Sequence, residues 1–291
     1  MDKEEGLEKL IKLKPSESGK LRIKNYLINY KVWGKGKPLL LIHGVNIGWG
    51  QWYQNIPDLA KKRKVYILDL PGSGNSTKVD FKKTNFERDF VNVVQQFLKL
   101  KKITKIDVIG HSFGGAIVLS LIIKKDKRID KVILVNPMGF SSYVPNQQKI
   151  LSIYQLAKFL SKTAMKPTRE NIRKFLLSVL IKKITLADEF IDYYYQAVKE
   201  DQRSHPFLFM NAFMKNFKIK KNLIFIDKLP QINKEILLIF GSKDPIIKQQ
   251  KNLDNFKLIP KIKIKLLANV GHVPFLEESV QFNKIVINYL K

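Results

Sequence analysis

The sequence of 291 residues contains no cysteine, and this absence removes several classes of chemistry. Disulfide bridges, thiolate metal sites and cysteine nucleophiles all require a thiol. The chain also lacks a His-Glu-x-x-His pattern and a nucleotide-binding glycine fingerprint after its first expected strand. We therefore expect a protein that needs neither a metal ion nor an organic cofactor.

Long apolar runs are missing as well. No stretch approaches the roughly 18 apolar residues that a membrane-spanning helix requires. The opening residues, Met1 to Gly6, are too charged for a secretory signal peptide. With 45% hydrophobic residues, the chain can bury a sizeable core. These observations favour a globular protein located in the cytoplasm.

Acidic residues and arginine are both scarce beside lysine. The chain has 53 Lys and Arg against 25 Asp and Glu, a formal charge of +28, yet only seven of the 53 are Arg. Nucleic-acid surfaces exploit the planar arginine fork, which lysine lacks, and no long basic block occurs. We expect no nucleic-acid partner and at most a weak attraction to anionic surfaces. The oligomeric state is left open.

Glycine is absent from one long segment, because none of the 15 glycines lies between Gly139 and Gly241. A segment without glycine that is rich in Leu, Ile, Phe, Tyr and Lys is expected to form helices. We place a helical cap at residues 141–228. All four internal methionines fall in it or at its edge: Met138, Met165, Met210 and Met214. Methionine and aromatic side chains pack a core and also suit an adaptable apolar pocket.

Short apolar runs flank this cap and alternate with helical patterns. The runs lie at residues 39–42, 65–68, 106–109, 132–135, 236–240 and 262–267. Such runs are typical of strands covered on both faces, and the alternation predicts a mostly parallel sheet with helices on both sides. The fold class is α/β. Its catalytic domain is assigned to residues 21–140 and 229–291, opened by an antiparallel hairpin, after a polar segment at residues 1–20 with at most one short helix.

One junction between a strand and a helix carries the pattern of a nucleophile. Gly110-His111-Ser112-Phe113-Gly114 follows an apolar strand and precedes an apolar helix at residues 116–123. G-x-S-x-G in this context places the serine on a tight turn with its hydroxyl above the sheet edge. Side chains at the two glycines would collide with neighbouring backbone. The helix N-terminus directs free N–H groups toward negative charge that develops beside the serine.

This pattern resembles the nucleophile elbow of the α/β-hydrolases, and the likeness extends from about Leu21 to Lys291. His43-Gly44, after an apolar strand, is similar to the oxyanion loop of that family, and Asp69 to Ser76 is similar to its D-x-P-G-x-G-x-S loop. The resemblance implies that the backbone N–H groups of Val45 and Phe113 form an oxyanion hole. Such donors contribute about 3 kcal/mol each to the stability of the transition state.

A serine nucleophile needs a base within hydrogen-bond reach and an acid that orients the base. In this family the order along the chain is Ser, then Asp or Glu, then His. Of the four histidines only His272 follows the last expected strand, and Asp244 follows a buried strand in Gly-x-x-Asp-Pro. The resemblance therefore implies Ser112 as nucleophile, His272 as general base and then acid, and Asp244 as the orienting acid. Some relatives place the acid after the sixth strand, where Asn136 cannot serve.

Three functions remain open, with a small molecule as the expected partner. The favoured one is hydrolysis of carboxylic esters with small to medium, mainly apolar acyl groups through an acyl-enzyme. The first alternative is carbon–carbon bond hydrolysis, since residues 166–173 and 186–191 are similar to the cap of meta-cleavage-product hydrolases. Those enzymes usually carry Asn in place of His111 and Trp in place of Val273. The second alternative is a ligand-binding protein of this fold without catalysis.

Overall fold

A single eight-stranded sheet organises the computed structural model, which describes residues 4–45, 47–201, 203 and 205–291. The strands in spatial order are β1 (Glu17–Ile23), β2 (Tyr26–Trp33), β4 (Arg63–Leu68), β3 (Lys37–Ile42), β5 (Ile106–His111), β6 (Ile129–Val135), β9 (Ile236–Gly241) and β10 (Ile262–Leu267). β2 pairs antiparallel with β1 and with β4, and every other pair in the sheet is parallel. The predicted mostly parallel sheet with an opening hairpin is confirmed.

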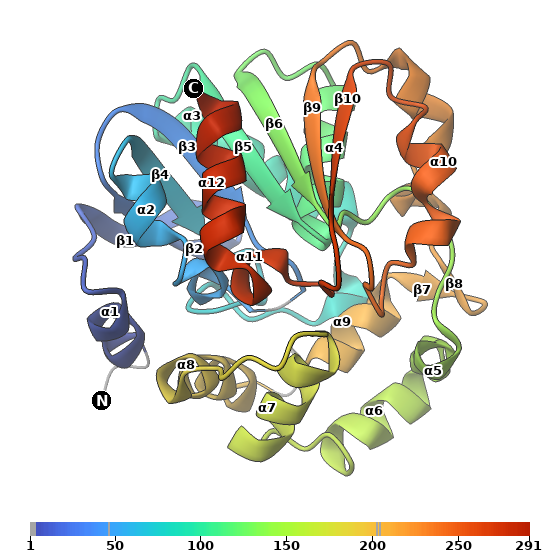
Figure 1. Cartoon of the computed structure of the whole chain (residues 1–291). Helices are drawn as coiled ribbons and strands as arrows, with labels where there is room; N and C mark the ends of the chain where they lie inside the picture. Colours follow the sequence, from blue (N-terminus) through green and yellow to red (C-terminus); the bar gives the residue numbers. More distant parts are fainter. Residues whose placement is uncertain (1–3, 46, 202, 204) are drawn as a thin grey trace.

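The central strands are apolar throughout because helices cover both faces of the sheet (Figure 1). In β3, Leu39 and Leu41 point into one core, while Leu40 and Ile42 point into the other. Successive side chains of a strand alternate between faces, so two covered faces require an unbroken apolar run. One core contains α3 (Asn92–Leu100) and α4 (Phe113–Ile123), and the other contains α2 (Ile56–Ala60) and α12 (Ser279–Leu290).

The N-terminal segment packs against the sheet domain more closely than its polar composition suggested. Helix α1 (Glu5–Ile11) buries Leu7 and Ile11, and β1 begins four residues before the expected start of the domain. Glu4 is buried, where it accepts a hydrogen bond of 2.7 Å from the indole of Trp49 and pairs with Lys31 at 2.8 Å. A buried carboxylate is tolerated here because it is both paired and hydrogen-bonded.

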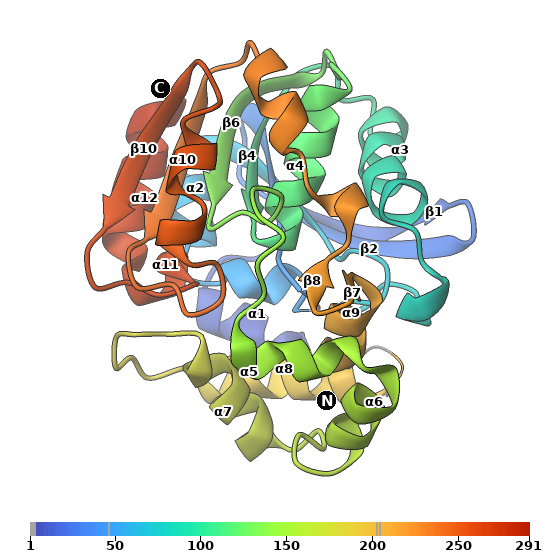
Figure 2. The same cartoon turned by 90° about the vertical axis from the view of Figure 1, so that its right-hand side faces the viewer.

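The cap forms a separate layer across one end of the sheet (Figures 1 and 2). Its helices are α5 (Asn146–Lys149), α6 (Tyr154–Lys162), α7 (Arg169–Ser178), α8 (Asp188–Lys199) and α9 (Pro206–Ala212). A small hairpin of β7 (Met214–Lys215) and β8 (Lys218–Ile219) follows and was not expected from the sequence. Asn216 and Phe217 make its turn with φ of 50° and 61°, a left-handed conformation that glycine usually supplies.

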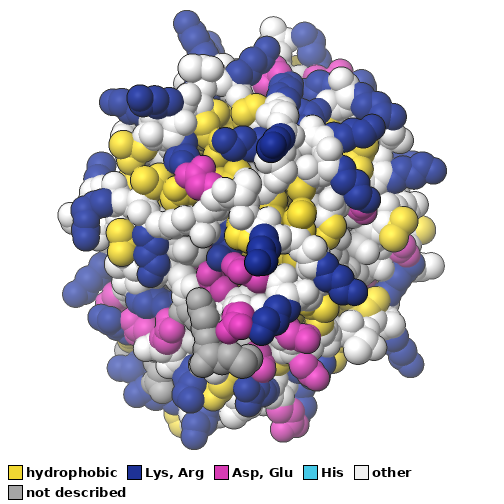
Figure 3. Space-filling model, turned by 90° about the vertical axis from the view of Figure 1, so that its left-hand side faces the viewer, with side chains coloured by type: hydrophobic (Ala, Val, Ile, Leu, Met, Phe, Trp, Pro, Cys, Tyr) yellow, Lys and Arg dark blue, Asp and Glu magenta, His cyan; other side chains and the backbone are white. Residues whose placement is uncertain are grey.

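Charged side chains are spread over the surface. On the face in Figure 3, lysine and arginine side chains are scattered without forming one continuous stripe, and acidic side chains gather in its lower half. This arrangement agrees with lysine filling solvated surfaces. Within the described ranges, every helix is too short or too polar to cross a bilayer.

Candidate active site

Ser112 lies at the junction of β5 and α4 in a strained backbone conformation. Its φ of 52° and ψ of −114° are unusual for a residue with a side chain. Neighbouring segments hold this conformation, because the Ser112 N–H donates to the carbonyl of Val135 at 3.0 Å and its carbonyl accepts from the N–H of Met138 at 3.0 Å. Strain of this kind is maintained where the surrounding structure over-determines it, commonly at functional sites.

The two glycines that flank the turn allow its close packing. A Cβ at Gly110 would lie 2.6 Å from the carbonyl oxygen of Gly114, and a Cβ at Gly114 would lie 2.4 Å from the carbonyl oxygen of Ile42. Both distances are shorter than any real carbon–oxygen contact, so a larger residue would force the turn apart. The serine is therefore placed above the sheet by backbone packing that only glycine permits.

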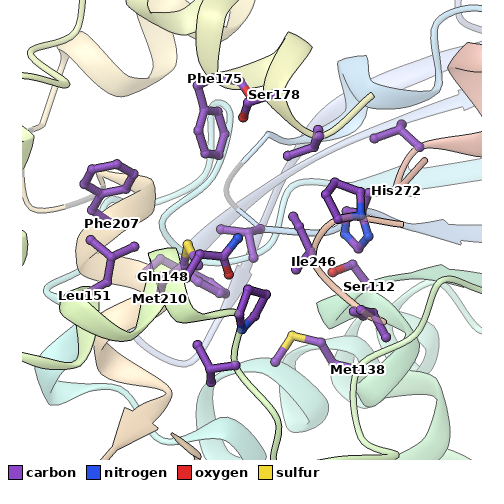
Figure 4. Close-up of a pocket in the computed structure, with 18 of the residues that line it drawn as sticks. Ser112, Met138, Gln148, Leu151, Phe175, Ser178, Phe207, Met210, Ile246 and His272 are labelled. Atoms are coloured by element: carbon purple, nitrogen blue, oxygen red, sulfur yellow. The ribbon is translucent and has the colours of Figure 1, made fainter. Parts of the chain in front are cut away.

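His272 and Asp244 form a buried pair beside the serine. The Nδ1 atom of His272 lies 2.7 Å from Oδ2 of Asp244. Since a carboxylate only accepts hydrogen bonds, Nδ1 carries the proton and Nε2 is left as the basic atom. Ser112 and His272 both line one cavity, and Figure 4 shows their side chains at the same end of it. The structure thus brings the three expected residues together.

Backbone and side-chain donors surround the Asp244 carboxylate. Its Oδ1 accepts from the N–H groups of Ile246 at 2.7 Å and Ile247 at 2.9 Å. Its Oδ2 also accepts from the side-chain amide of Asn136, whose oxygen in turn accepts from the N–H of Gly241. Asn136 therefore serves the acid as a donor, a contact that sequence alone did not indicate.

The expected oxyanion donors belong to two different segments, the loop after β3 and the start of α4. Phe113 is the first residue of α4, so its N–H has no partner within the helix. Val45 lines the cavity in the loop after β3. Within the described residues no acceptor is bonded to either N–H. The arrangement leaves both groups available to a negative oxygen.

The other histidines near the site are neutral and structural. Burial lowers the pKa of His43 to about 4, and its ring joins the carbonyl of Gly44 to the N–H of Leu70. Burial, with a smaller contribution from His272, also lowers the pKa of His111 well below its usual range. His205 caps α9 in the cap. None of these three is placed to act as the base.

A chain of hydrogen bonds joins the oxyanion loop to the histidine loop. The Gly44 N–H donates to Oε1 of Gln51 at 3.2 Å, and Nε2 of Gln51 lies 2.9 Å from Nδ1 of His111. Nε2 of His111 lies 2.9 Å from the carbonyl oxygen of His272. Because the Gln51 amide donates to Nδ1, the His111 proton sits on Nε2 and donates to that carbonyl. Sequence reasoning missed Gln51, which carries no motif of its own.

The cap is hydrogen-bonded directly to the loop that carries His272. The His272 N–H donates to the carbonyl of Val179 at 2.9 Å. The buried carboxylate of Glu277 accepts from Gly271 at 2.9 Å, from Ile181 at 2.8 Å and from Lys182 at 2.9 Å. Glu277 thus joins the segment that follows α7 to the residue before His272. The only sequence signal for it is a carboxylate shortly after the Gly-His pair.

A cavity of about 540 Å³ lies between the cap and the candidate catalytic residues Ser112 and His272. Met138 and Ile246 lie at its Ser112 end, whereas Phe175, Phe207 and Leu151 lie at the far end (Figure 4). Its volume falls in the range of small-molecule sites. Most lining side chains are apolar. Among the described residues, Lys174 is the one Lys or Arg that lines it, and Lys174 pairs with Glu170 at 2.6 Å.

No cluster of His, Asp and Glu able to hold a metal ion occurs among the residues that the structure describes. The polar side chains that line the cavity include the candidate nucleophile Ser112 and the candidate base His272, together with amides such as Gln51 and Gln148. This donor set suits acyl chemistry at a carbonyl group rather than coordination of a cation.

Comparison with known proteins agrees with the geometry. A family model for the alpha/beta hydrolase fold matches residues 37–279. The 2-hydroxy-6-oxo-6-phenylhexa-2,4-dienoate hydrolase of Comamonas testosteroni is 23% identical over 283 residues, which cover 92% of this chain and 93% of the relative.

Two solved structures illustrate the range of the likeness. The meta-cleavage product hydrolase of Pseudomonas fluorescens IP01 has a TM-score of 0.77 at 21% identity, covering 95% of this chain and 97% of that one. A carboxylesterase of Bacillus subtilis has a TM-score of 0.78 at 16% identity, covering 99% and 96%. At these identities the structural likeness establishes the fold alone.

Proposed function

The chain belongs to the α/β-hydrolase family, and from this premise we propose that it is a serine hydrolase of carboxylic esters with small to medium, mainly apolar acyl groups. The observation that carries the proposal is the buried His272–Asp244 pair beside Ser112 at one end of an apolar cavity.

The proposed reaction proceeds in two halves. Oγ of Ser112 attacks the ester carbonyl carbon while Nε2 of His272 accepts its proton, and the N–H groups of Val45 and Phe113 bind the resulting oxyanion. The intermediate collapses, and the departing alcohol takes the proton from His272. Water then attacks the acyl-enzyme, with His272 again as base, and the carboxylic acid leaves Ser112. Asp244 keeps the imidazole oriented throughout and holds the charge that forms on it.

The cavity supports an apolar acyl group. An acyl chain bound to Ser112 would extend past Met138 and Ile246 toward the phenylalanines of the cap (Figure 4). Each buried methylene contributes at most about 0.8 kcal/mol, or about fourfold in kcat/KM. Selectivity should therefore rise with chain length until the cavity is full.

Carbon–carbon hydrolysis is the second candidate, because relatives that align over nearly the whole chain are named as dienoate hydrolases. A dienoate carries a carboxylate, and a buried carboxylate needs a cationic partner. Among the described lining residues only Lys174 could supply it, and Lys174 is already paired with Glu170. This favours the ester.

Turnover of p-nitrophenyl esters of increasing acyl length, measured beside one dienoate, tests the proposal. We expect kcat/KM to rise from acetate toward medium chains, with a burst of p-nitrophenol that equals the enzyme present. Turnover of the dienoate above all the esters would establish the second candidate instead. Absence of turnover with every substrate would favour a ligand-binding protein.

A further inference from the structure

The segment that roofs the cavity also presents apolar side chains to solvent. Leu151 lines the cavity from the turn Ile150–Ser152, and Leu160 lines it from α6. On the same segment Ile153 is 43% exposed and Phe159 is 60% exposed, and Ile150, which also lines the cavity, is 40% exposed. Folding leaves these large apolar groups in water although their neighbours are buried, so the segment has two apolar sides. The outer side is left without a partner within the described chain.

Helix α6 arranges its outer side as a stripe. Its exposed residues include Lys158, Phe159 and Lys162, whereas Ala157 and Ser161 are buried. Positions three and four apart lie on one face of a helix. Lys162 therefore shares the solvent side with Lys158, four positions before it, and with Phe159, three positions before it. A helix that combines lysine with a large apolar side chain on its outer face is suited to the boundary between water and lipid.

Charge on this segment is of one sign. No Asp or Glu occurs from residue 131 to residue 169. Among the described residues, Lys149, Lys158, Lys162 and Lys166 take part in no ion pair. Helix α7 differs, because its three cations Arg169, Arg173 and Lys174 each pair with a carboxylate.

The β7–β8 hairpin also combines exposed lysine with an exposed phenylalanine, as α6 does. It contacts the turn Ile150–Ser152, which precedes α6. At its tip Phe217 is 48% exposed in a left-handed conformation, between Lys215 and Lys218 along the chain. A phenylalanine in that conformation costs conformational energy, and about half of this side chain faces solvent.

We define the cap rim as the exposed or half-buried apolar residues and lysines of these two elements. Its members are Lys149, Ile150, Ile153, Lys158, Phe159, Lys162, Lys215, Phe217 and Lys218. We propose that the cap rim docks on an anionic phospholipid surface, with the lysines at the headgroups and the apolar side chains inserted between them. Because the segment that carries the cap rim also covers the cavity, docking would bring the entrance of the cavity close to the lipid. This role in delivering apolar esters rests on the proposed function.

The composition of the rim selects lipid over other anionic partners. Lysine binds phosphate as a point charge, and a nucleic-acid surface would be expected to carry arginine forks instead. No arginine belongs to the rim. The interleaved isoleucine and phenylalanine side chains have no counterpart on a phosphate backbone but match the boundary of acyl chains.

Sedimentation with lipid vesicles tests the proposal. The wild-type protein should bind vesicles of equal parts phosphatidylcholine and phosphatidylglycerol. It should not bind phosphatidylcholine alone, and it should be released at about 1 M salt, where the Debye length is about 3 Å. Lys158→Ala with Lys162→Ala should weaken binding about 25-fold, since each lysine near an anionic surface contributes about fivefold.

Matched controls separate the rim from the general charge of the protein. Lys127→Ala with Lys284→Ala removes two exposed lysines away from the cap and should leave binding within about twofold of the wild type. Phe159→Ser should weaken binding about tenfold, whereas Leu100→Ser, at a side chain 50% exposed at the end of α3, should not. Equal losses in rim and control variants would overturn the proposal, as would binding of a single-stranded oligonucleotide without binding of vesicles.

Hydrolysis of a soluble p-nitrophenyl ester, measured on each variant, keeps the two proposals apart. None of the substituted side chains lines the cavity, so each variant should keep wild-type turnover. Ester turnover without vesicle binding would refute the docking proposal alone. Vesicle binding without turnover of any ester would refute the proposed function but not the docking proposal.

Discussion

Replacing Glu277 by glutamine should damage catalysis from a position outside the triad. The carboxylate accepts three backbone hydrogen bonds, one from Gly271 and two from Ile181 and Lys182. A glutamine has one acceptor oxygen and one donor group of the same size. If its oxygen faces the two cap donors, its NH₂ group faces the N–H of Gly271, and that buried donor loses its partner.

The magnitude follows from these contacts. A buried donor without a partner costs about 1–3 kcal/mol, and weaker bonds to a neutral acceptor add to that loss, so the free energy of unfolding should fall by about 2–4 kcal/mol. Gly271 precedes His272, and displacement of a catalytic group by about 1 Å can cost about 100-fold in rate. We expect kcat for a p-nitrophenyl ester to fall between about 10-fold and 100-fold well below the unfolding temperature.

The adjacent residue provides the control. Glu278 forms an ion pair with Lys182 that is partly exposed to solvent. Such surface pairs contribute about 0–1 kcal/mol, so Glu278→Gln should remain close to the wild type in stability and kcat. A Glu277→Gln protein that is folded and turns over at the wild-type rate would refute the claim that Glu277 positions the base.

Three further predictions concern the loops, pH and metal ions. Gln51→Leu breaks the hydrogen bonds to Gly44 and His111 and should lower kcat at least about tenfold, with a smaller change in KM. An unchanged kcat would show that the loop at Gly44 keeps its position without the Gln51 side chain. Burial lowers the pKa of His43 to about 4, so the unfolded chain binds protons near pH 6.5 that the folded chain does not, and stability should fall as the pH drops from about 6.5 to about 4. Burial raises the pKa of Asp69 to about 6, and this group alone would make the protein less stable as the pH rises over the same window. Its effect offsets only part of the loss on acidification, because His43 and His111 both contribute to that loss. An unfolding temperature that increases on acidification would contradict the reasoning. Ester turnover should persist in excess chelator without added ions, and loss of activity restored by a divalent cation would contradict that expectation.

The fold was largely predictable because its determinants are local in sequence. Strands such as β3 and β9 show as apolar runs, since both faces of the sheet are covered. The hairpin at Asn216 and Phe217 was not predictable, because a turn without glycine leaves no composition signal. The packing of α1 was also hidden, since it depends on the distant partners Lys31 and Trp49 of Glu4.

The candidate site likewise has one part that the sequence predicts and one part that it does not. The turn at Ser112 could be located from sequence because the two glycines are required by contacts with adjacent backbone. The supporting residues could not. Gln51 and Glu277 both accept hydrogen bonds from backbone N–H groups, and such bonds place no demand on the identity of the residue that donates. The second bond of Gln51, to the side chain of His111, joins residues 60 positions apart and leaves no local pattern. Only the three-dimensional arrangement shows that they join the catalytic loops.

The central claim is that Ser112 attacks an ester and carries the acyl group. Its most direct test is the mass of the protein quenched during turnover of a p-nitrophenyl ester, compared between the wild type and Ser112→Ala. The account predicts an acyl adduct on the peptide that contains Ser112. It also predicts no adduct in Ser112→Ala, with turnover reduced by several powers of ten and an unchanged unfolding temperature. Near-normal turnover by folded Ser112→Ala, or an adduct on a different residue, would contradict it.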